Sequence, residues 1–239
     1  MAQENNYTIE NFDPEVLREY DIRGVVGENI NENTAYTIGR TFGHTVKSKL
    51  TSHTIVTGYD GRLTSPSLHK ALCEGLKDSG VKVINIGMGP TPMTYFAHYH
   101  FEADAAVMLT GSHNPSEYNG FKMVFNKHSF FAEDIQSLQK LLDNNALELS
   151  DGQIIEQDIT KEYIERDLLN ISLNRKLKVA WDPGNGAMGK VTRDITEKLI
   201  NSKNIIINEE VDGNFPNHHP DPTCLLYTSD AADDRNCVD

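Results

Sequence analysis

Short apolar runs alternate with segments of helical spacing along the first two thirds of the chain. Residues 54–57, 81–86 and 105–109 are apolar, rich in β-branched residues, and short enough to be buried strands. Residues 33–49, 65–76 and 92–101 place apolar side chains three and four positions apart, as a helix packed on one face does. This order predicts a parallel sheet with helices on both faces and a ligand site at the carboxyl edge of its strands.

A second unit of the same kind follows a polar, turn-rich segment at residues 143–152. Helical spacing at 159–173 precedes an apolar strand at 177–181, a glycine-rich loop at 182–189, a helix at 190–201 and a strand at 205–207. We therefore place a first domain at 1–150 and a second from 151 onward. The predicted fold class is tandem three-layer α/β domains with mixed, mainly parallel sheets.

The charge balance and the three cysteines narrow the class of protein. The net charge is −13, which disfavours binding to nucleic acid or to an anionic membrane surface. No run of 18 apolar residues is present, and the N-terminus has no secretory pattern. The cysteines show no paired spacing, so a disulfide scaffold is not expected. We expect a soluble cytoplasmic protein.

Residues 224–239 differ from what precedes them. The stretch CLLYTSDAAD resembles the translation of a sequencing-library adapter, and two of the three cysteines lie in these sixteen residues. We interpret 224–239 as a non-native tail and 1–223 as the natural sequence.

The most informative motif is TGSHNP at residues 110–115, directly after the third predicted strand. It places Ser112 at the ligand edge of the sheet. The G-x-S-x-G elbow of hydrolases is not formed, because Asn114 stands where glycine is required. His113 is adjacent in sequence and unsuited to be the base of a triad. By spacing alone, Ser112 is a phosphate carrier, a nucleophile or an ordinary capping serine.

Three cations are candidates for binding a phosphate. Lys122 opens a short strand after an Asn-Gly turn, and a hairpin would fold it back toward Ser112. Arg23 stands beside a glycine, where a guanidinium can meet a phosphate. Arg62 follows the first predicted strand and either holds a phosphate or pairs with Asp60. Lys122 and Arg23 are each also compatible with a solvated surface position.

Two further motifs are better explained by structure than by chemistry. Residues 182–189 match neither the dinucleotide fingerprint nor a P-loop, so tight packing between strand and helix is favoured over nucleotide binding. His218 and His219, with Asp212 and Asp221 nearby, lack the spacing of zinc ligands and fit a proline-rich connector.

Taken together, the chain resembles the alpha-D-phosphohexomutase family, and its bacterial phosphomannomutase/phosphoglucomutase branch in particular. The resemblance rests on four stretches in the family's order: EYDIRGVVG at 19–27, TGSHNPSEYNGFKMV at 110–124, WDPGNGA at 181–187 and DGNFPNHHPDPT at 212–223. It implies a protein of four domains, about twice this length, of which 1–150 is domain I and 151–223 is an incomplete domain II.

The resemblance also implies roles for individual residues. Ser112 matches the phosphoserine, Lys122 the general base, and Tyr20 and Arg23 two residues of the active site, while His113 would support the phosphoryl site by hydrogen bonding. The implied reaction interconverts hexose 1-phosphate and hexose 6-phosphate through a hexose 1,6-bisphosphate. Mg²⁺ is the implied cofactor, held in part by the phosphoryl oxygen on Ser112.

The family's metal loop, D-x-D-x-D-R, would follow residue 223 and is not found there. We therefore expect this chain to be an N-terminal fragment that is inactive as a mutase by itself. The alternative from the residues alone is a binding module for a sugar phosphate or a nucleotide that performs no chemistry.

Overall fold

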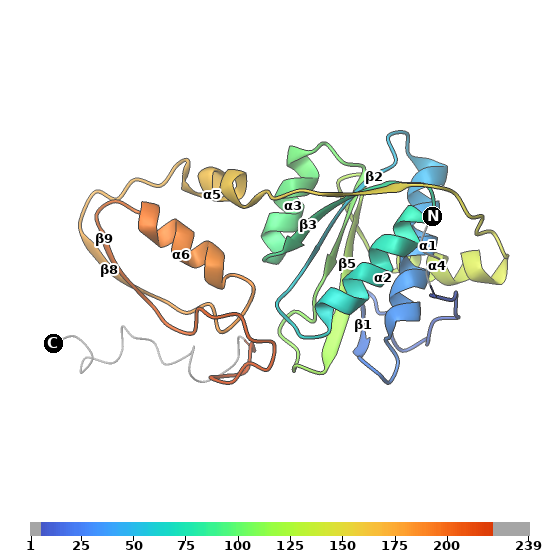
Figure 1. Cartoon of the computed structure of the whole chain (residues 1–239), viewed down its shortest axis with the longest axis horizontal. Coiled ribbons are helices and arrows are strands. Elements are labelled where there is room, and N and C mark those ends of the chain that lie inside the picture. Colours follow the sequence, from blue (N-terminus) through green and yellow to red (C-terminus); the bar gives the residue numbers. More distant parts are fainter. Residues whose placement is uncertain (1–5, 222–239) are drawn as a thin grey trace.

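The computed structural model describes residues 6–221 and shows two α/β units joined through α5 (Figure 1). The tail predicted at 224–239 lies outside the described residues. The helices are α1 (Glu32–Lys49), α2 (Ser65–Lys77), α3 (Thr91–His100), α4 (Glu133–Asp143), α5 (Thr160–Leu168) and α6 (Gly189–Lys198). The strands are β1 (Ile22–Val25), β2 (Thr54–Tyr59), β3 (Lys82–Met88), β4 (Ala105–Leu109), β5 (Tyr118–Phe125), β6 (His128–Phe130), β7 (Gln153–Glu156), β8 (Leu177–Trp181) and β9 (Ser202–Ile206).

The first unit contains a mixed sheet in the order β1-β5-β4-β2-β3-β7, with β6 paired to β5. Strands β4, β2, β3 and β7 run parallel, whereas β5 is antiparallel to both β4 and β1. The predicted antiparallel return of β5 along β4 is confirmed, but the predicted Asn-Gly turn is wrong: Asn119 and Gly120 lie within β5, paired with β1, and Lys122 is the fifth residue of that strand. Two edge strands of four residues, β1 and β7, were not predicted, because neither has the alternation or the length that identifies a strand. β7 extends the first sheet past residue 150, where we placed the domain boundary.

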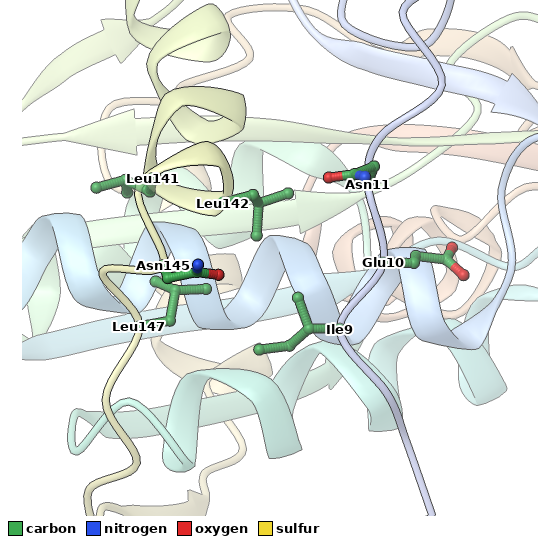
Figure 2. A pocket seen from close by; sticks show the side chains of 7 residues that line it. All are labelled: Ile9, Glu10, Asn11, Leu141, Leu142, Asn145 and Leu147. Carbon is green, nitrogen blue, oxygen red and sulfur yellow. The ribbon is translucent and has the colours of Figure 1, made fainter.

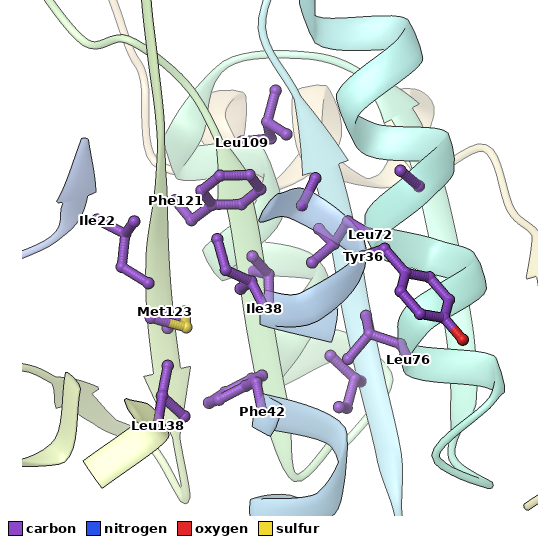
Figure 3. Close-up of a cluster of buried hydrophobic side chains, with 14 of the residues drawn as sticks. Ile22, Tyr36, Ile38, Phe42, Leu72, Leu76, Leu109, Phe121, Met123 and Leu138 are labelled. Atoms are coloured by element: carbon purple, nitrogen blue, oxygen red, sulfur yellow. The ribbon is translucent and has the colours of Figure 1, made fainter. Parts of the chain in front are cut away.

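Helices α1, α2 and α4 cover one face of this sheet (Figure 1). α1 begins with a capping box formed by Asn31 and Thr34. α1 and α2 cross in close contact, because a Cβ on Gly75 would stand 2.2 Å from a backbone oxygen of α1. Figure 3 shows the core they enclose, with Phe42 of α1 and Phe121 of β5 fully buried. This core fixes the sheet that carries the predicted site.

The opposite face of the sheet is covered by α3, against which α5 of the second unit packs, and α5 in turn packs on α6. The apolar cluster there joins Val56 and Met93 of the first unit to Tyr163, Val191 and Ile195 of α5 and α6. The two units therefore share one buried core. Because that core spans both units, it places the loops of the second unit against the carboxyl edge of the first sheet.

In the second unit, β8 and β9 form a parallel pair, and α6 packs on one face of it. The side chains alternate along both strands between half-buried and exposed, with Ile205 59% exposed on the open face. Within residues 6–221, no helix combines the length and the apolar character needed to cross a bilayer.

Candidate active site

Ser112 lies between β4 and β5, in a segment of residues 110–118 that includes the first residue of β5 and that we call the serine loop. Its side chain is exposed, and its backbone adopts a left-handed φ of 55°. Its N–H donates to Oγ1 of Thr110 over 2.8 Å. The hydroxyl lies 3.4 Å from Nδ1 of His113, at the long end of hydrogen-bond range. The loop thus presents the Ser112 hydroxyl to solvent at the carboxyl edge of the sheet, where the sequence predicted a ligand site.

A buried arginine, Arg62, supports the serine loop from the protein interior. Its side chain is only 1% exposed, and its Nε donates to Asp60 over 3.2 Å. Its two terminal nitrogens donate over 2.5–3.1 Å to four carbonyl oxygens of the serine loop, those of Ser112, Asn114, Pro115 and Tyr118. Of the two roles open for Arg62, the structure shows the pairing with Asp60.

Desolvation lowers the pKa of Arg62, and the neighbouring Asp60 carboxylate opposes that shift. The guanidinium fits against Gly111, where an added Cβ would stand 2.4 Å from both Cζ and Nε of Arg62. Gly111 is therefore required by the close approach of the arginine.

Asp60 joins several polar side chains at the same edge of the sheet by hydrogen bonds. Its carboxylate accepts hydrogen bonds from the Thr110 hydroxyl over 2.8 Å and from the Ser65 hydroxyl over 2.6 Å. Ser65 also accepts from the side-chain amide of Asn119, which is fully buried at the start of β5. Sequence reasoning missed Thr110 and Asn119. The Asp-Gly-Arg sequence directly after β2 was the available signal, but Thr110, which donates to Asp60, lies fifty residues away in the sequence.

Arg23 and Lys122 meet through a shared carboxylate. Asp21 forms a short ion pair with Arg23, and its Oδ2 lies 3.7 Å from Nζ of Lys122. In the β4–β5 ladder Lys122 stands directly opposite Met108, so both side chains project from the same face of the sheet. Met108 lines the cavity beside Ser112. Lys122 therefore lies next to the cavity that contains Ser112 in its wall, and Arg23 lies beside Lys122.

Tyr20 lies in the turn just before β1, and its side chain is 74% exposed. It precedes Asp21 in the chain and so lies close to the two cations. The structure thus forms two groups from the predicted residues: Ser112 with His113 on the serine loop, and Arg23 with Lys122 around Asp21.

The cavity beside Ser112 has a volume of about 290 Å³ and draws its walls from both units. The first unit contributes Thr110, Ser112 and the turn after β2. The second contributes its glycine-rich loop and Phe215. A small polar ligand held there would touch both units, with the Ser112 hydroxyl among its neighbours.

The glycine-rich loop of the second unit, residues 182–189, packs tightly as predicted. A Cβ on Gly189 would stand 1.8 Å from the carbonyl oxygen of Glu209, which leaves no space for a side chain. Asn185 is buried and ties this loop to the following segment: its N–H donates to the Asn208 carbonyl, and its side chain donates to the Glu210 carbonyl. The packing interpretation explains these contacts.

His218 pairs with Asp182 over 3.0 Å. Burial alone would lower the pKa of His218, but the carbonyl of His219 and the Asp182 carboxylate outweigh burial, so that its pKa is raised. The described part of the chain contains no group of three or more acidic, histidine or cysteine side chains placed to hold a metal ion.

A larger cavity of about 440 Å³ lies elsewhere, between the segment before β1 and the end of α4 (Figure 2). Its walls are mainly Ile9, Leu141, Leu142 and Leu147, and its one acidic side chain, Glu10, already accepts a hydrogen bond from Thr34. It contains no nucleophile and no cation. The chemistry of its lining therefore favours the smaller cavity beside Ser112 as the functional site.

Comparisons with known proteins match most of the chain to one family. Residues 14–149 match the family described as phosphoglucomutase/phosphomannomutase, alpha/beta/alpha domain I, and residues 161–238 match domain II of the same family. A phosphomannomutase/phosphoglucomutase of Pseudomonas putida is 44% identical over 207 residues, covering 87% of this chain and 44% of that protein. A phosphoglucomutase of Neisseria gonorrhoeae is 39% identical, covering 87% of this chain and 45% of its own length.

The crystal structure of a phosphoglucomutase/phosphomannomutase family protein from Burkholderia thailandensis superimposes with a TM-score of 0.85 at 36% identity. The match covers 92% of this chain and 49% of that structure. The chain thus spans about half the length of the curated relatives it matches. With both α/β/α domains matched along the chain, it belongs to the phosphoglucomutase/phosphomannomutase family.

Proposed function

We propose that the chain belongs to a phosphohexomutase that interconverts the 1-phosphate and 6-phosphate of mannose or glucose, with Ser112 as its phosphoryl carrier. The observation that carries the proposal is the placement of Ser112. Its hydroxyl is exposed beside a cavity with walls from both units, on a loop fixed by a buried arginine. A phosphoryl carrier must be accessible to sugars of two orientations and yet held in place, and this loop meets both requirements.

In the proposed transfer, a free hydroxyl oxygen of the sugar phosphate attacks phosphorus on phospho-Ser112. The new O–P bond forms as the bond from Oγ of Ser112 to phosphorus breaks. The hydroxyl proton passes to Lys122 in its neutral form, and the departing Oγ of Ser112 takes up a proton from solvent. A hexose 1,6-bisphosphate results. After it turns over in the cavity, Oγ of Ser112 attacks its other phosphoryl group and releases its proton to solvent, while Lys122 returns its proton to the departing sugar oxygen.

The remaining site residues bind and orient in this proposal. Arg23 and Tyr20, at the turn and strand next to Lys122, hold the phosphate that is not being transferred. His113 donates a hydrogen bond to the phosphoryl group on Ser112, since its ring already lies against the hydroxyl. Asp21 pairs with both cations and so fixes their positions when no substrate is bound.

Mg²⁺ remains a prediction. A phosphoryl oxygen on Ser112 is one hard ligand, but the described residues supply no group of further acidic ligands around it, and Asp60 is already saturated with hydrogen bonds. Cytoplasmic location and the bisphosphate partner remain predictions in the same sense.

The test is phosphorylation of Ser112 itself. The chain is incubated with glucose 1,6-bisphosphate, with and without Mg²⁺, and the intact mass and the peptide covering 110–118 are measured by mass spectrometry. We expect one phosphoryl group on Ser112, none in Ser112→Ala, and an unchanged result in Ser116→Ala, an exposed serine of the same loop. If titration calorimetry detects binding of glucose 6-phosphate but no phosphoryl group ever appears, the binding-module alternative is favoured.

A further inference from the structure

The motif DGNFP at residues 212–216 has no role in the proposed chemistry, although it lies against the serine loop's support. Residues 211–215 pack directly on the turn after β2. A Cβ on Gly61 would stand 2.3 Å from Val211, and a Cβ on Gly213 would stand 2.8 Å from Cα of Arg62. At such distances the second unit contacts the backbone that carries Arg62, with no space for water between them.

Phe215 completes this contact. Its ring lies over the guanidinium of Arg62, with Cζ 5.2 Å from the ring centroid. Its backbone has a left-handed φ of 50°, which is uncommon for an aromatic residue. Two hydrogen bonds impose that conformation: the Phe215 N–H donates to the Asp212 carbonyl over 3.0 Å, and the Asn214 N–H donates to the Asp212 side chain over 2.9 Å. Strain retained in this way points to a functional placement of the ring.

We propose that Phe215 is a positioning residue for Ser112, acting through Arg62. The ring covers one face of the guanidinium whose hydrogen bonds hold four carbonyls of the serine loop. Keeping water from that face preserves the low dielectric in which those hydrogen bonds are strong. The proposal rests on the proposed function, since the loop it holds is the one that carries the phosphoryl group.

Phe215 is in turn positioned by the second unit. Asp212 donates its N–H to the carbonyl of Asn185 over 3.0 Å, and Asn217 donates its side-chain amide to Oδ1 of Asn185 over 2.8 Å. A continuous set of contacts therefore runs from the glycine-rich loop through Phe215 and Arg62 to Ser112. The second unit thereby fixes the nucleophile's loop as well as forming a wall of the cavity.

The test is hydrogen exchange of the 239-residue chain, read on peptides that cover the serine loop. In Phe215→Ala we expect amides of 110–118 to exchange about tenfold faster, the loss that a partly desolvated cation–π contact corresponds to. Phe215→Tyr keeps the ring and should exchange like the unchanged protein. Phe131→Ala removes an exposed aromatic of the first unit and serves as the matched control.

The location of the effect decides the result. Faster exchange in 110–118, with α1, α2, β8 and α6 unchanged, supports the proposal. Unchanged exchange in 110–118, or an equal increase across the second unit, overturns it. If Phe215→Ala unfolds the second unit, Phe215→Leu retains the bulk without the aromatic face and is judged by the same two criteria.

The exchange experiment contains no sugar phosphate, so its outcome is independent of the proposed function. A wild-type chain that never takes up a phosphoryl group from glucose 1,6-bisphosphate contradicts the function and leaves the contact intact. If uptake does occur, its initial rate should fall in Phe215→Ala by about the same tenfold factor and be restored in Phe215→Tyr.

Discussion

Replacing Arg62 with alanine should destabilise the first unit more than any surface arginine does. The side chain is buried, carries a full charge, and supplies five hydrogen bonds, one to Asp60 and four to carbonyls of the serine loop. Truncation leaves the Asp60 carboxylate without its cation and the four carbonyls without donors. The serine loop then keeps its own short-range hydrogen bonds and the bond from Thr110 to Asp60, but loses the one side chain that joins four of its carbonyls.

The size of the effect follows from these contacts. Breaking a buried ion pair by removing one partner costs about 3–5 kcal/mol. A buried acceptor left without a donor costs about 1–3 kcal/mol. Asp60 keeps its hydrogen bonds from Thr110 and Ser65, and the adjacent cavity admits water to some of the carbonyls. We therefore expect a loss of about 4 kcal/mol in the free energy of unfolding, which is near the middle of the ion-pair range.

The assay is urea unfolding followed by far-UV circular dichroism, with hydrogen exchange in α1 and α2 to assign the transition to the first unit. Arg175→Ala, at an exposed site of the second unit, is the control and should change the free energy by less than about 0.5 kcal/mol. Arg62→Lys keeps the charge but not the planar fork, so it should recover less than half of the loss. A loss below about 1 kcal/mol in Arg62→Ala would show that the guanidinium does not support the loop.

Three further outcomes follow from buried groups. Gly111→Ala forces a methyl group against Arg62 and should cost about 2 kcal/mol in the same urea assay; a neutral result would contradict the close approach. Burial lowers the pKa of His69 to about 4. Between about pH 6.5 and pH 4 the His69 imidazole is therefore protonated in the unfolded chain and neutral in the folded chain. Stability should therefore fall by up to about 3 kcal/mol as pH drops through that window, and His69→Leu should flatten the decline. Burial raises the pKa of the Cys73 thiol to about 12, so peptide mapping should find Cys73 unlabelled by iodoacetamide at pH 8 in the folded chain and labelled in urea.

The sequence predicted those parts of the fold that depend on local patterns. The strands at β2, β3 and β4 and the helices between them follow from periodicity, and the position of Ser112 after β4 follows from their order. The short edge strands β1 and β7 have no such pattern. β1 even contains Arg23 and Gly24, which weaken a strand assignment, and it is formed because β5 offers a partner edge.

The residues that support the serine loop were less predictable than the position of Ser112. Arg62 and Phe215 are 153 positions apart, and Asp60 and Thr110 are 50 apart. No local pattern identifies which of several arginines is buried or which phenylalanine covers it. From the sequence, Arg62 could either bind a phosphate or pair with Asp60. In the structure it pairs with Asp60 and also donates hydrogen bonds to four carbonyls of the serine loop. Long-range packing decides such roles, and a single sequence does not display it.

The backbone of Ser112 supports a functional reading on independent grounds. In the described chain the left-handed conformation is taken repeatedly by asparagine or glycine, as at Asn126, Asn185 and Gly184, residues that tolerate it at low cost. Serine at φ 55° costs about 1 kcal/mol more, so either of those residues would make the serine loop more stable. Such a loss of stability is retained where the serine side chain has a role that asparagine or glycine cannot fill. Neither asparagine nor glycine has a hydroxyl, and the hydroxyl is the only group of Ser112 that no backbone contact uses. The conformation that stability disfavours is thus the one that brings a hydroxyl to the cavity.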